Sequence, residues 1–440
     1  MKIAMKKVRA SALLLLFALA SLPVKSEVKS APAEDLHLLV AAAVTNNPEV
    51  KSSEARWKMF TSKAKQATAL DDPMLMLKLQ SVSPTEPWVL NRDPQSAKVI
   101  GLSQQLPFWG KRALRQEVAN HEAESWRWAV EERKLELTRM VTESYYQIWG
   151  IDKELAVLDK NLKLLADFVA ITELKYSLGQ GVQQDIFKAG LEKSRMLEMQ
   201  ISLQQQRKSV EANLNYLLHR SGNTSVGTVA DFALPQVTLS PEQLYTTATE
   251  RRPQVKSLTS LVLKSEASQR LAEREKYPDF NLSLEYMFRE PVSTTMAPDP
   301  GDDMVTLGVT FNLPYQQEKR REMRSESGYE RIMANEELNA LKSSISLTIN
   351  ETLVQMERRR KLVELYKGGI IPQAEQSLES ALISYQVGKV DFLTLLDSRM
   401  NLFNAERALY DSQVEYMMKL AQLEAATGTE LATPSKPPHP

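Results

Sequence analysis

Cysteine and histidine, which often carry catalysis or bind metals, are absent or scarce in this chain of 440 residues. It has no cysteine, which excludes disulfide scaffolds, thiolate zinc sites, iron–sulfur clusters and cysteine nucleophiles. The histidines lie far apart in the sequence, and no two have the spacing of a metal-binding pair. No metal site and no cofactor are therefore expected. The four histidines are His37, His121, His219 and His439.

Motifs of the common enzyme classes are also missing. We find no nucleophile elbow, no phosphate-binding loop and no pair of carboxylates in a glycine-framed loop. Lysine plus arginine number 55 and aspartate plus glutamate number 55, so the formal net charge is 0, which argues against nucleic-acid binding. We predict that the protein is not an enzyme, although a secreted or periplasmic enzyme stays open as an alternative.

One group of side chains has the chemistry to bind a soft metal. Several methionines lie in or near segments with a strand pattern, and thioethers suit Cu(I). Methionine is more often a flexible packing residue, so both interpretations stay open. These methionines are Met74, Met76, Met287, Met296 and Met304.

The first residues predict an export signal. Four basic residues precede an apolar run from Ala10 to Ala20, which is too short to span a bilayer. We therefore predict a signal peptide over residues 1–20. No later run reaches the ~18 apolar residues of a membrane-spanning helix, so any membrane crossing must use strands.

The remaining chain contains two similar halves. A near-constant offset between matching residues predicts a duplicated structural unit. We expect the first repeat over 21–222, a linker over 223–241, the second repeat over 242–428 and a disordered, proline-rich tail over 429–440. The matches, with their offsets, are Pro48 with Pro253 (205), Pro107 with Pro314 (207), Tyr176 with Tyr385 (209), Gly179 with Gly388 (209) and Gly222 with Gly428 (206).

Each half is predicted to contain a helix, two strands and then two very long helices. The strands follow from apolar residues that alternate with period 2. The long helices follow from heptads, and Gly368, Gly369 and Pro372 predict a kink or break in one of them. The heptad of the first long helix is Ile151, Leu155, Leu158, Leu162, Leu165 and Val169. The predicted strands are about 73–82, 97–106, 278–290 and 303–313, and the long helices about 111–177, 183–220, 318–385 and 391–427.

These lengths suit an assembly better than a compact domain. A helix over 111–177 would be about 100 Å long, which suits a projecting tube. Four strands cannot close a barrel in lipid without leaving backbone groups unpaired, so several chains must combine. Two chains would give eight strands, too few for a conduit, whereas three would give twelve. We therefore predict a mainly α fold with a small β part that trimerises.

Together these features resemble the TolC-type outer-membrane efflux protein family. The resemblance covers the mature chain up to about Ala432. It rests on the duplicated layout, the two Tyr-x-x-Gly turns, Ile371-Pro372-Gln373-Ala374 and Leu395-Leu396-Asp397. It implies a homotrimer with a 12-stranded β-barrel among the lipids of a Gram-negative outer membrane, continued by an α-helical barrel into the periplasm. The implied partners are a periplasmic adaptor (membrane fusion) protein and an inner-membrane pump of the resistance-nodulation-division type.

The resemblance also implies site residues. Such proteins close a periplasmic aperture just after the second turn, where Tyr385 and Asp397 match the family's tyrosine and one aspartate. Thr394 stands where a second aspartate often occurs, and we expect Asp397 of three chains to bind cations at the narrow end. The aperture candidates are Tyr385, Asp397, Asp391, Thr394, Asp185 and Lys188. The candidates for adaptor contact are Tyr176, Gly179, Gly181, Gly388 and Lys389.

The cargo and one other function stay open. The segment from Ser103 to Arg112 resembles the heavy-metal exporter branch of the family, so heavy-metal cations are one candidate cargo. The alternative function is a periplasmic coiled-coil adaptor or structural protein. That class shares the signal peptide and the heptads. It would have one hairpin and compact β domains, whereas this sequence predicts two strand pairs, each followed by its own long helical hairpin.

Overall fold

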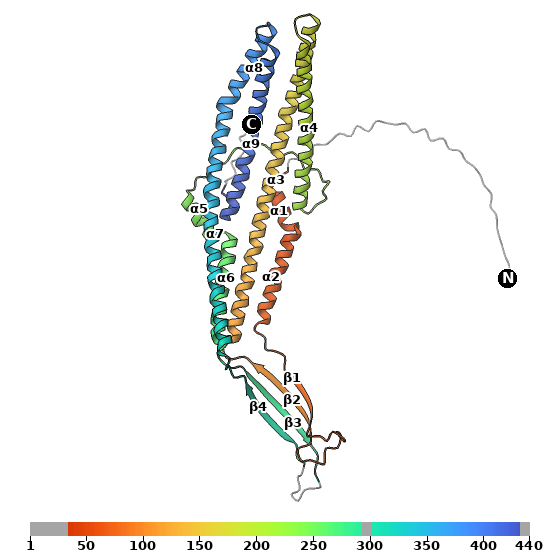
Figure 1. Cartoon of the computed structure of the whole chain (residues 1–440), viewed down its shortest axis with the longest axis vertical. Coiled ribbons are helices and arrows are strands. Elements are labelled where there is room, and N and C mark those ends of the chain that lie inside the picture. The colour runs from red at the N-terminus through yellow and green to blue at the C-terminus, as the bar shows by residue number, and fades with distance from the viewer. Residues whose placement is uncertain (1–33, 293–300, 432–440) are drawn as a thin grey trace, which may run out of the picture.

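The computed structural model describes residues 34–292 and 301–431, and its two halves have the same order of elements (Figure 1). The predicted signal peptide lies outside the described residues, as does Met296. The first half contains α1 (Leu36–Asn46), α2 (Pro48–Gln66), β1 (Met74–Gln80), β2 (Ala97–Leu106), α3 (Lys111–Ser177) and α4 (Gln183–Leu217). The second contains α5 (Pro241–Arg251), α6 (Pro253–Arg274), β3 (Phe280–Arg289), β4 (Met304–Phe311), α7 (Gln317–Leu365), the π-helical turn η1 (Tyr366–Ile370), α8 (Ile371–Gln386) and α9 (Phe392–Thr427).

Each half opens with two helices, where the sequence analysis expected one. Pro48 and Pro253 begin α2 and α6, and a proline favours extended backbone in the residue before it. Asn47 accordingly has φ −62° and ψ 126°, and Arg252 has φ −60° and ψ 124°. The expectation of a single helix is wrong because each proline ends one helix and starts the next.

Two long helical hairpins form the body of the molecule (Figure 1). α3 has 67 residues, which corresponds to about 100 Å, and its ends are those predicted from the sequence. It returns through α4. In the second hairpin, α7, η1 and α8 follow one another in line and return through α9. These hairpins place two helix turns together at the end of the molecule that is remote from the strands.

The glycines of the second hairpin do not break its helix. A kink or break was expected at Gly368, Gly369 and Pro372, and the structure has the π-helical turn η1 there. Proline lacks an amide hydrogen, and its ring would meet the carbonyl of the residue four positions earlier, which is Gly368. The wider π-helical turn accommodates the proline while both flanking residues keep right-handed helical backbone.

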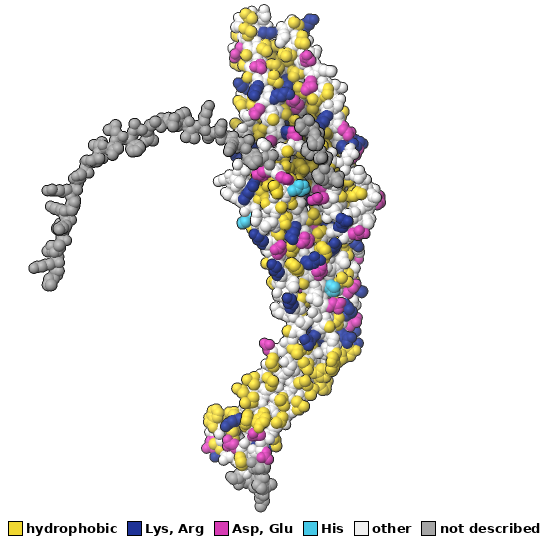
Figure 2. Space-filling view, turned by 180° about the vertical axis from the view of Figure 1, so that it is seen from behind, with side chains coloured by type: hydrophobic (Ala, Val, Ile, Leu, Met, Phe, Trp, Pro, Cys, Tyr) yellow, Lys and Arg dark blue, Asp and Glu magenta, His cyan; other side chains and the backbone are white. Residues whose placement is uncertain are grey.

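The four strands form one antiparallel sheet in the order β1-β2-β3-β4. The register aligns Leu77 with Ile100, Ile100 with Tyr286 and Tyr286 with Val305, so apolar side chains share one face. This face is uncovered in the single chain, where Leu307 is 78% exposed. Hydrophobic side chains accordingly dominate much of the strand region (Figure 2).

The core extends along the helices instead of filling one centre. One apolar cluster joins α3, α4, α8 and α9, a second joins α1, α2, α3 and α4, and a third joins α5, α6, α7 and α9. The predicted heptad of α3 is confirmed, because its members belong to the first cluster or pack against it. Ile151, Leu158 and Leu165 are buried, and Leu155, Leu162 and Val169 are partly buried.

The segment between the halves and the described end of the chain both pack on the helices. In the segment between the halves, Asp231 accepts a hydrogen bond from Trp149 Nε1 at 3.0 Å. At the described end of the chain, the Leu431 amide donates a hydrogen bond to Glu424 Oε1 at 2.9 Å. The prediction of disorder from residue 429 is therefore wrong for residues 429–431, because the end of α9 holds them. Residues 432–440 lie outside the described residues.

Candidate functional site

The two turns at the helix tips have the same backbone. Gly179 has φ +70° and Gly388 has φ +73°, in the left-handed region that favours glycine. In both turns, the amide of the residue after the glycine donates to the carbonyl five positions earlier, at 2.8 Å. This pattern closes a helix in a Schellman motif. The turns also contain Gly181 and the exposed Lys389.

The tyrosines that precede these glycines have opposite environments. Tyr176 is 47% exposed, whereas Tyr385 is only 5% exposed. The ring of Tyr385 packs against that of Phe392, with the centroids 5.8 Å apart. The predicted aperture tyrosine is therefore part of the tip's packing, while its counterpart is available to solvent.

Lys175 links the two tips. Its Nζ donates to the Tyr385 carbonyl at 2.5 Å and lies 4.1 Å from the centroid of the Tyr385 ring. An ammonium group is favourable at the end of a helix, where carbonyls point outward, and over an aromatic face. One lysine of α3 thus holds the end of α8. The sequence gives no sign of this role, because a lysine in the last turn of a helix is typically a solvated residue.

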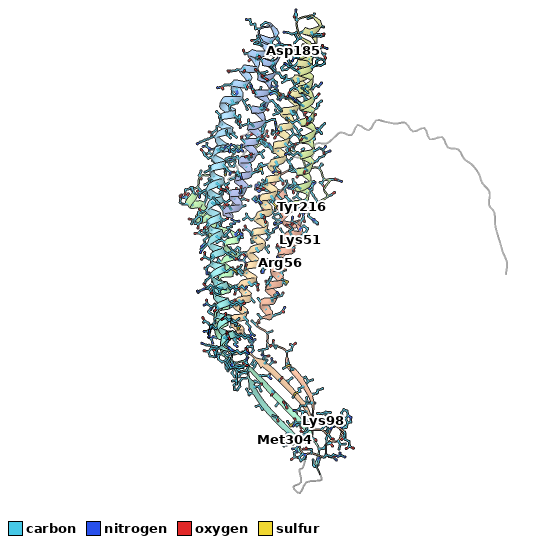
Figure 3. All side chains as sticks on the ribbon, viewed as in Figure 1. Lys51, Arg56, Lys98, Asp185, Tyr216 and Met304 are labelled. Atoms are coloured by element: carbon cyan, nitrogen blue, oxygen red, sulfur yellow. The ribbon has the colours of Figure 1, made fainter. Side chains whose placement is uncertain are left out.

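Most of the predicted aperture residues gather beside this link. Asp391 precedes α9 and accepts hydrogen bonds from the Thr394 amide at 2.9 Å and hydroxyl at 2.6 Å. These bonds are the main reason why the pKa of Asp391 is lowered. Burial raises the pKa of Asp185 (Figure 3), with Lys188 opposing this shift and Asp391 adding to it.

The electrostatic coupling extends to the tyrosine. Burial raises the pKa of Tyr385, and the charge of Asp185 raises it further. Asp185, Lys188, Tyr385, Asp391 and Thr394 therefore form one neighbourhood, which we call the tip cluster. It joins residues that lie about 200 positions apart in the sequence.

Asp397 lies outside the tip cluster. It is exposed on α9, and its side chain makes no hydrogen bond or ion pair with the residues that the structure describes. Thr394, Asn401 and Asn404 are exposed three or four positions apart along the same helix, so they share a face with Asp397. The aspartate belongs to a polar stripe that faces away from the apolar core.

A buried arginine in α9 was missed by the sequence analysis. Arg399 is 1% exposed, and its Nε and Nη2 have no hydrogen-bond partner among the described residues. Burial lowers its pKa, and the nearby Glu406 opposes this shift. The signal was present, because position 399 lies three or four residues from Leu395, Leu396, Leu402 and Phe403 and so falls on the apolar stripe.

Two contacts between the antiparallel helices α3 and α9 indicate that a second polar residue lies near this arginine. Phe168 meets Phe392, and Glu154 accepts hydrogen bonds from Arg407. This register puts Asn161 level with Arg399 on the neighbouring helix. Asn161 is fully buried, and its Oδ1 also lacks a partner among the described residues.

The segment from Ser103 to Arg112 joins the sheet to the helices. Lys111 is 1% exposed, and its Nζ lies 3.0 Å from both Glu275 Oε2 and Asp279 Oδ1. The ring of Phe108 stacks on that of Tyr277 with the centroids 4.5 Å apart. The described contacts of this segment are therefore structural.

The described residues offer no cluster of three or more histidine, aspartate or glutamate side chains suited to a metal ion. None of the helices in the described part of the chain has both the length and the apolar character needed to cross a membrane.

Comparison with known proteins identifies relatives of this architecture. The sequence profile of the family described as outer membrane efflux protein matches residues 39–218 and 244–429, one stretch in each half. No curated protein matches the sequence.

Several solved structures share the fold. VceC from Vibrio cholerae is 16% identical, with a TM-score of 0.75, over 90% of this chain and 96% of VceC. CmeC from Campylobacter jejuni is 15% identical, with a TM-score of 0.72, over 98% and 95% of the two chains. The open state of MtrE from Neisseria gonorrhoeae is 14% identical, with a TM-score of 0.74, over 90% and 89%.

Proposed function

Because the chain belongs to the outer membrane efflux protein family, we propose that three copies form a passive export channel through the outer membrane. The channel continues into the periplasm, where an adaptor protein connects it to an inner-membrane pump. The described residues contain no phosphate-binding loop, so the pump supplies the energy.

The open sheet is the observation that carries this proposal. It has an exposed apolar face and two edge strands, β1 and β4. In lipid, the backbone groups of such edges must be paired, because no water is present to satisfy them. Pairing β4 of one copy with β1 of the next closes a ring, and three copies supply twelve strands. Two copies would supply eight, and a barrel of that size is filled by its own side chains.

The helices support the same assembly. Large apolar side chains on α4 and α7 are exposed in the single chain, among them Ile201 at 62% and Val354 at 70%. Neighbouring copies would cover these side chains when the helices line up as the wall of a tube. α3 is long enough to extend this tube far from the membrane.

The proposed aperture consists of the tip cluster and of Asp397, which lies beyond that cluster on α9 and is the proposed cation site. Three copies would bring three aspartates toward one axis, where a ring of like charge attracts cations. Asp397→Ala should lower the block of channel conductance by multivalent cations in a planar lipid bilayer. Asp167→Ala, which removes an exposed aspartate from α3, is the charge-matched control. Equal block in both variants and the unmodified protein would refute this role.

The residues of the two turns are the proposed contacts for the adaptor. Tyr176, Gly179, Gly181, Gly388 and Lys389 lie at the end of the molecule remote from the sheet, where a periplasmic partner would approach (Figure 1). Tyr385 is excluded from this set because it is buried. Cross-linking from position 176, but not from position 385, to a periplasmic protein would support this assignment.

Heavy-metal cations are the proposed cargo class. The support is the resemblance of the segment from Ser103 to Arg112 to metal exporters. Deletion of the gene should then lower the metal tolerance of cells, and the intact gene should restore it. Unchanged tolerance to copper, silver, zinc and cobalt would refute this cargo while leaving the channel itself untouched.

The assembly is tested by the mass of the protein extracted in mild detergent from outer membranes. A species of three chains supports the channel. A soluble periplasmic monomer would refute it and favour the periplasmic coiled-coil adaptor or structural protein.

A further inference from the structure

We propose that the polar face of the sheet carries a track of thioethers that binds soft monovalent cations such as Cu(I) and Ag(I). The track consists of Met74 and Met76 on β1, Met287 on β3 and Met304 on β4. The inference rests on the proposed function only in taking this face as the lining of the conduit.

The strand register places all four methionines on one face. Met76 aligns with Gly101, which aligns with Glu285, and Met287 aligns directly with Met304. Side chains two positions apart along a strand point to the same side. Met74 and Met76 therefore share the face of Glu285 and Met287. Within the four described strands, the opposite, apolar face carries no methionine.

Packing does not account for this distribution. The apolar face consists of leucine, isoleucine, valine, phenylalanine and tyrosine with few exceptions, whereas the face with the methionines also presents serine, threonine, asparagine and charged side chains. Met74 is 60% exposed and Met304 is 50% exposed, so neither fills a core. Figure 3 shows Met304 near the end of the sheet that is remote from the helices.

The spacing suits binding by pairs of thioethers. Side chains directly opposite on antiparallel strands have their Cβ atoms about 5 Å apart, so the sulfurs of Met287 and Met304 can meet at one ion. From the level of Met74 to that of Met304 the register advances four residues, or about 13 Å along the strands. A cation would thus find successive ligands along the face.

One glycine makes room for this arrangement. A Cβ on Gly101 would lie 2.9 Å from Met76 Cε and 3.2 Å from Glu285 Cγ, so any larger residue would displace these side chains. The thioether of Met76 and the side chain of Glu285 converge over the bare backbone of β2. A carboxylate beside a thioether adds negative charge where the ion would pass.

The surrounding charges favour soft ions over hard ones. Lys78 aligns with Val99 in the row of Met287 and Met304, and Arg289 lines the surface pocket that contains both methionines. These positive charges disfavour hard cations, which bind proteins mainly through electrostatic attraction. Thioethers donate well to Cu(I) and poorly to Mg²⁺ or Ca²⁺, so binding here selects by softness.

The test measures Ag(I) binding to the full-length protein in detergent by equilibrium dialysis, with X-ray absorption at the silver edge to detect sulfur ligands. The variant is M74L/M76L/M287L/M304L, since leucine is close to methionine in volume. The control is M59L/M333L, which removes exposed methionines from α2 and α7. The strand variant should bind Ag(I) more than about tenfold more weakly, since even the loss of outer-shell groups costs that much.

The outcomes separate this inference from the channel proposal. Conductance in a planar lipid bilayer is recorded for the same preparations. Intact pores with unchanged Ag(I) binding in the strand variant, or equal losses in the control, would overturn the thioether track and leave the channel standing. Strand-dependent Ag(I) binding by a protein that forms no pore would support the track and overturn the channel.

Discussion

The two helix tips of this protein share a backbone and differ in their side chains. Both turns close in a Schellman motif with a glycine at φ of about +70°, in the left-handed region that favours glycine. Yet Tyr176 is exposed and Tyr385 is buried. Lys175 of the first tip binds Tyr385 of the second, and the position that matches Lys175 in the second tip is Ser384. The two halves thus share the turn, while the residues around it differ and contact one another across the tips.

The largest expected difference between the tips is in the tyrosines. Tyr385→Ala should destabilise the second tip by about 3 kcal/mol, because it removes a buried ring that packs on Phe392. Tyr176→Ala should change stability by less than about 0.5 kcal/mol, because its ring is half exposed. Hydrogen exchange of the amides around each turn measures both. Similar effects at the two tips would contradict the comparison.

Removal of the lysine link should come next in size. Lys175→Met should destabilise the second tip by about 1–2 kcal/mol, from the loss of a charged hydrogen bond and a cation–π contact. Amides from 385 to 391 should then exchange faster. Ser384→Ala at the matching position is the control and should leave both tips unchanged.

The helix starts that follow the turns provide a smaller contrast. Asp391 caps α9, whereas Val182 stands before α4 and cannot cap it. Asp391→Ala should speed exchange of the first-turn amides of α9 a few-fold. Val182→Asp should slow exchange at the start of α4 and so make the first tip resemble the second. Unchanged amide exchange in both variants would show that these residues do not stabilise the starts of α9 and α4.

The smallest expected effect is a pH dependence with opposite signs for two aspartates. The pKa of Asp185 is raised, so its contribution stabilises the tip at acid pH and is lost as pH rises through that pKa. The pKa of Asp391 is lowered, so its contribution is present at neutral pH and is lost as pH falls through that pKa.

Two amide variants test these signs. Asp185→Asn should raise the free energy of tip opening at pH 7 by less than about 0.5 kcal/mol. This difference between the variant and the unmodified protein should vanish near pH 3. Asp391→Asn should speed opening at pH 7 and have less effect at acid pH. Hydrogen exchange across this pH range, corrected for intrinsic rates, measures both. If the tip of the Asp185→Asn variant opened faster at pH 7, ionised Asp185 would stabilise the tip, contrary to this prediction.

The sequence predicts elements well where one local pattern decides them. The ends of β2 and α3 agree with expectation because alternation and heptads stop at clear boundaries there. The helix breaks before Pro48 and Pro253 needed only the backbone rule for residues before proline, which the single-helix prediction overlooked.

The site is harder to predict because it depends on contacts between the halves. The resemblance indicated Tyr385 and Asp185, but no local pattern shows that they interact or that Tyr385 is buried. Lys175 gives no signal in its own helix, since its partner is 210 residues away. Arg399 does give a signal, because it is a charged residue on an apolar stripe.

The π-helical turn η1 bears on how the two halves diverged. From Pro107 and Pro314 to Tyr176 and Tyr385, the offset between matching residues grows from 207 to 209, so the second half has two more residues over this stretch. An inserted residue would normally rotate the rest of an α-helix by about 100° and turn its apolar stripe away from the core. A π-helical turn holds one extra residue within one wider turn and limits that rotation, so η1 accounts for one of the two added residues. In evolutionary terms, η1 marks where the second half could accept an insertion without losing the helix register beyond it.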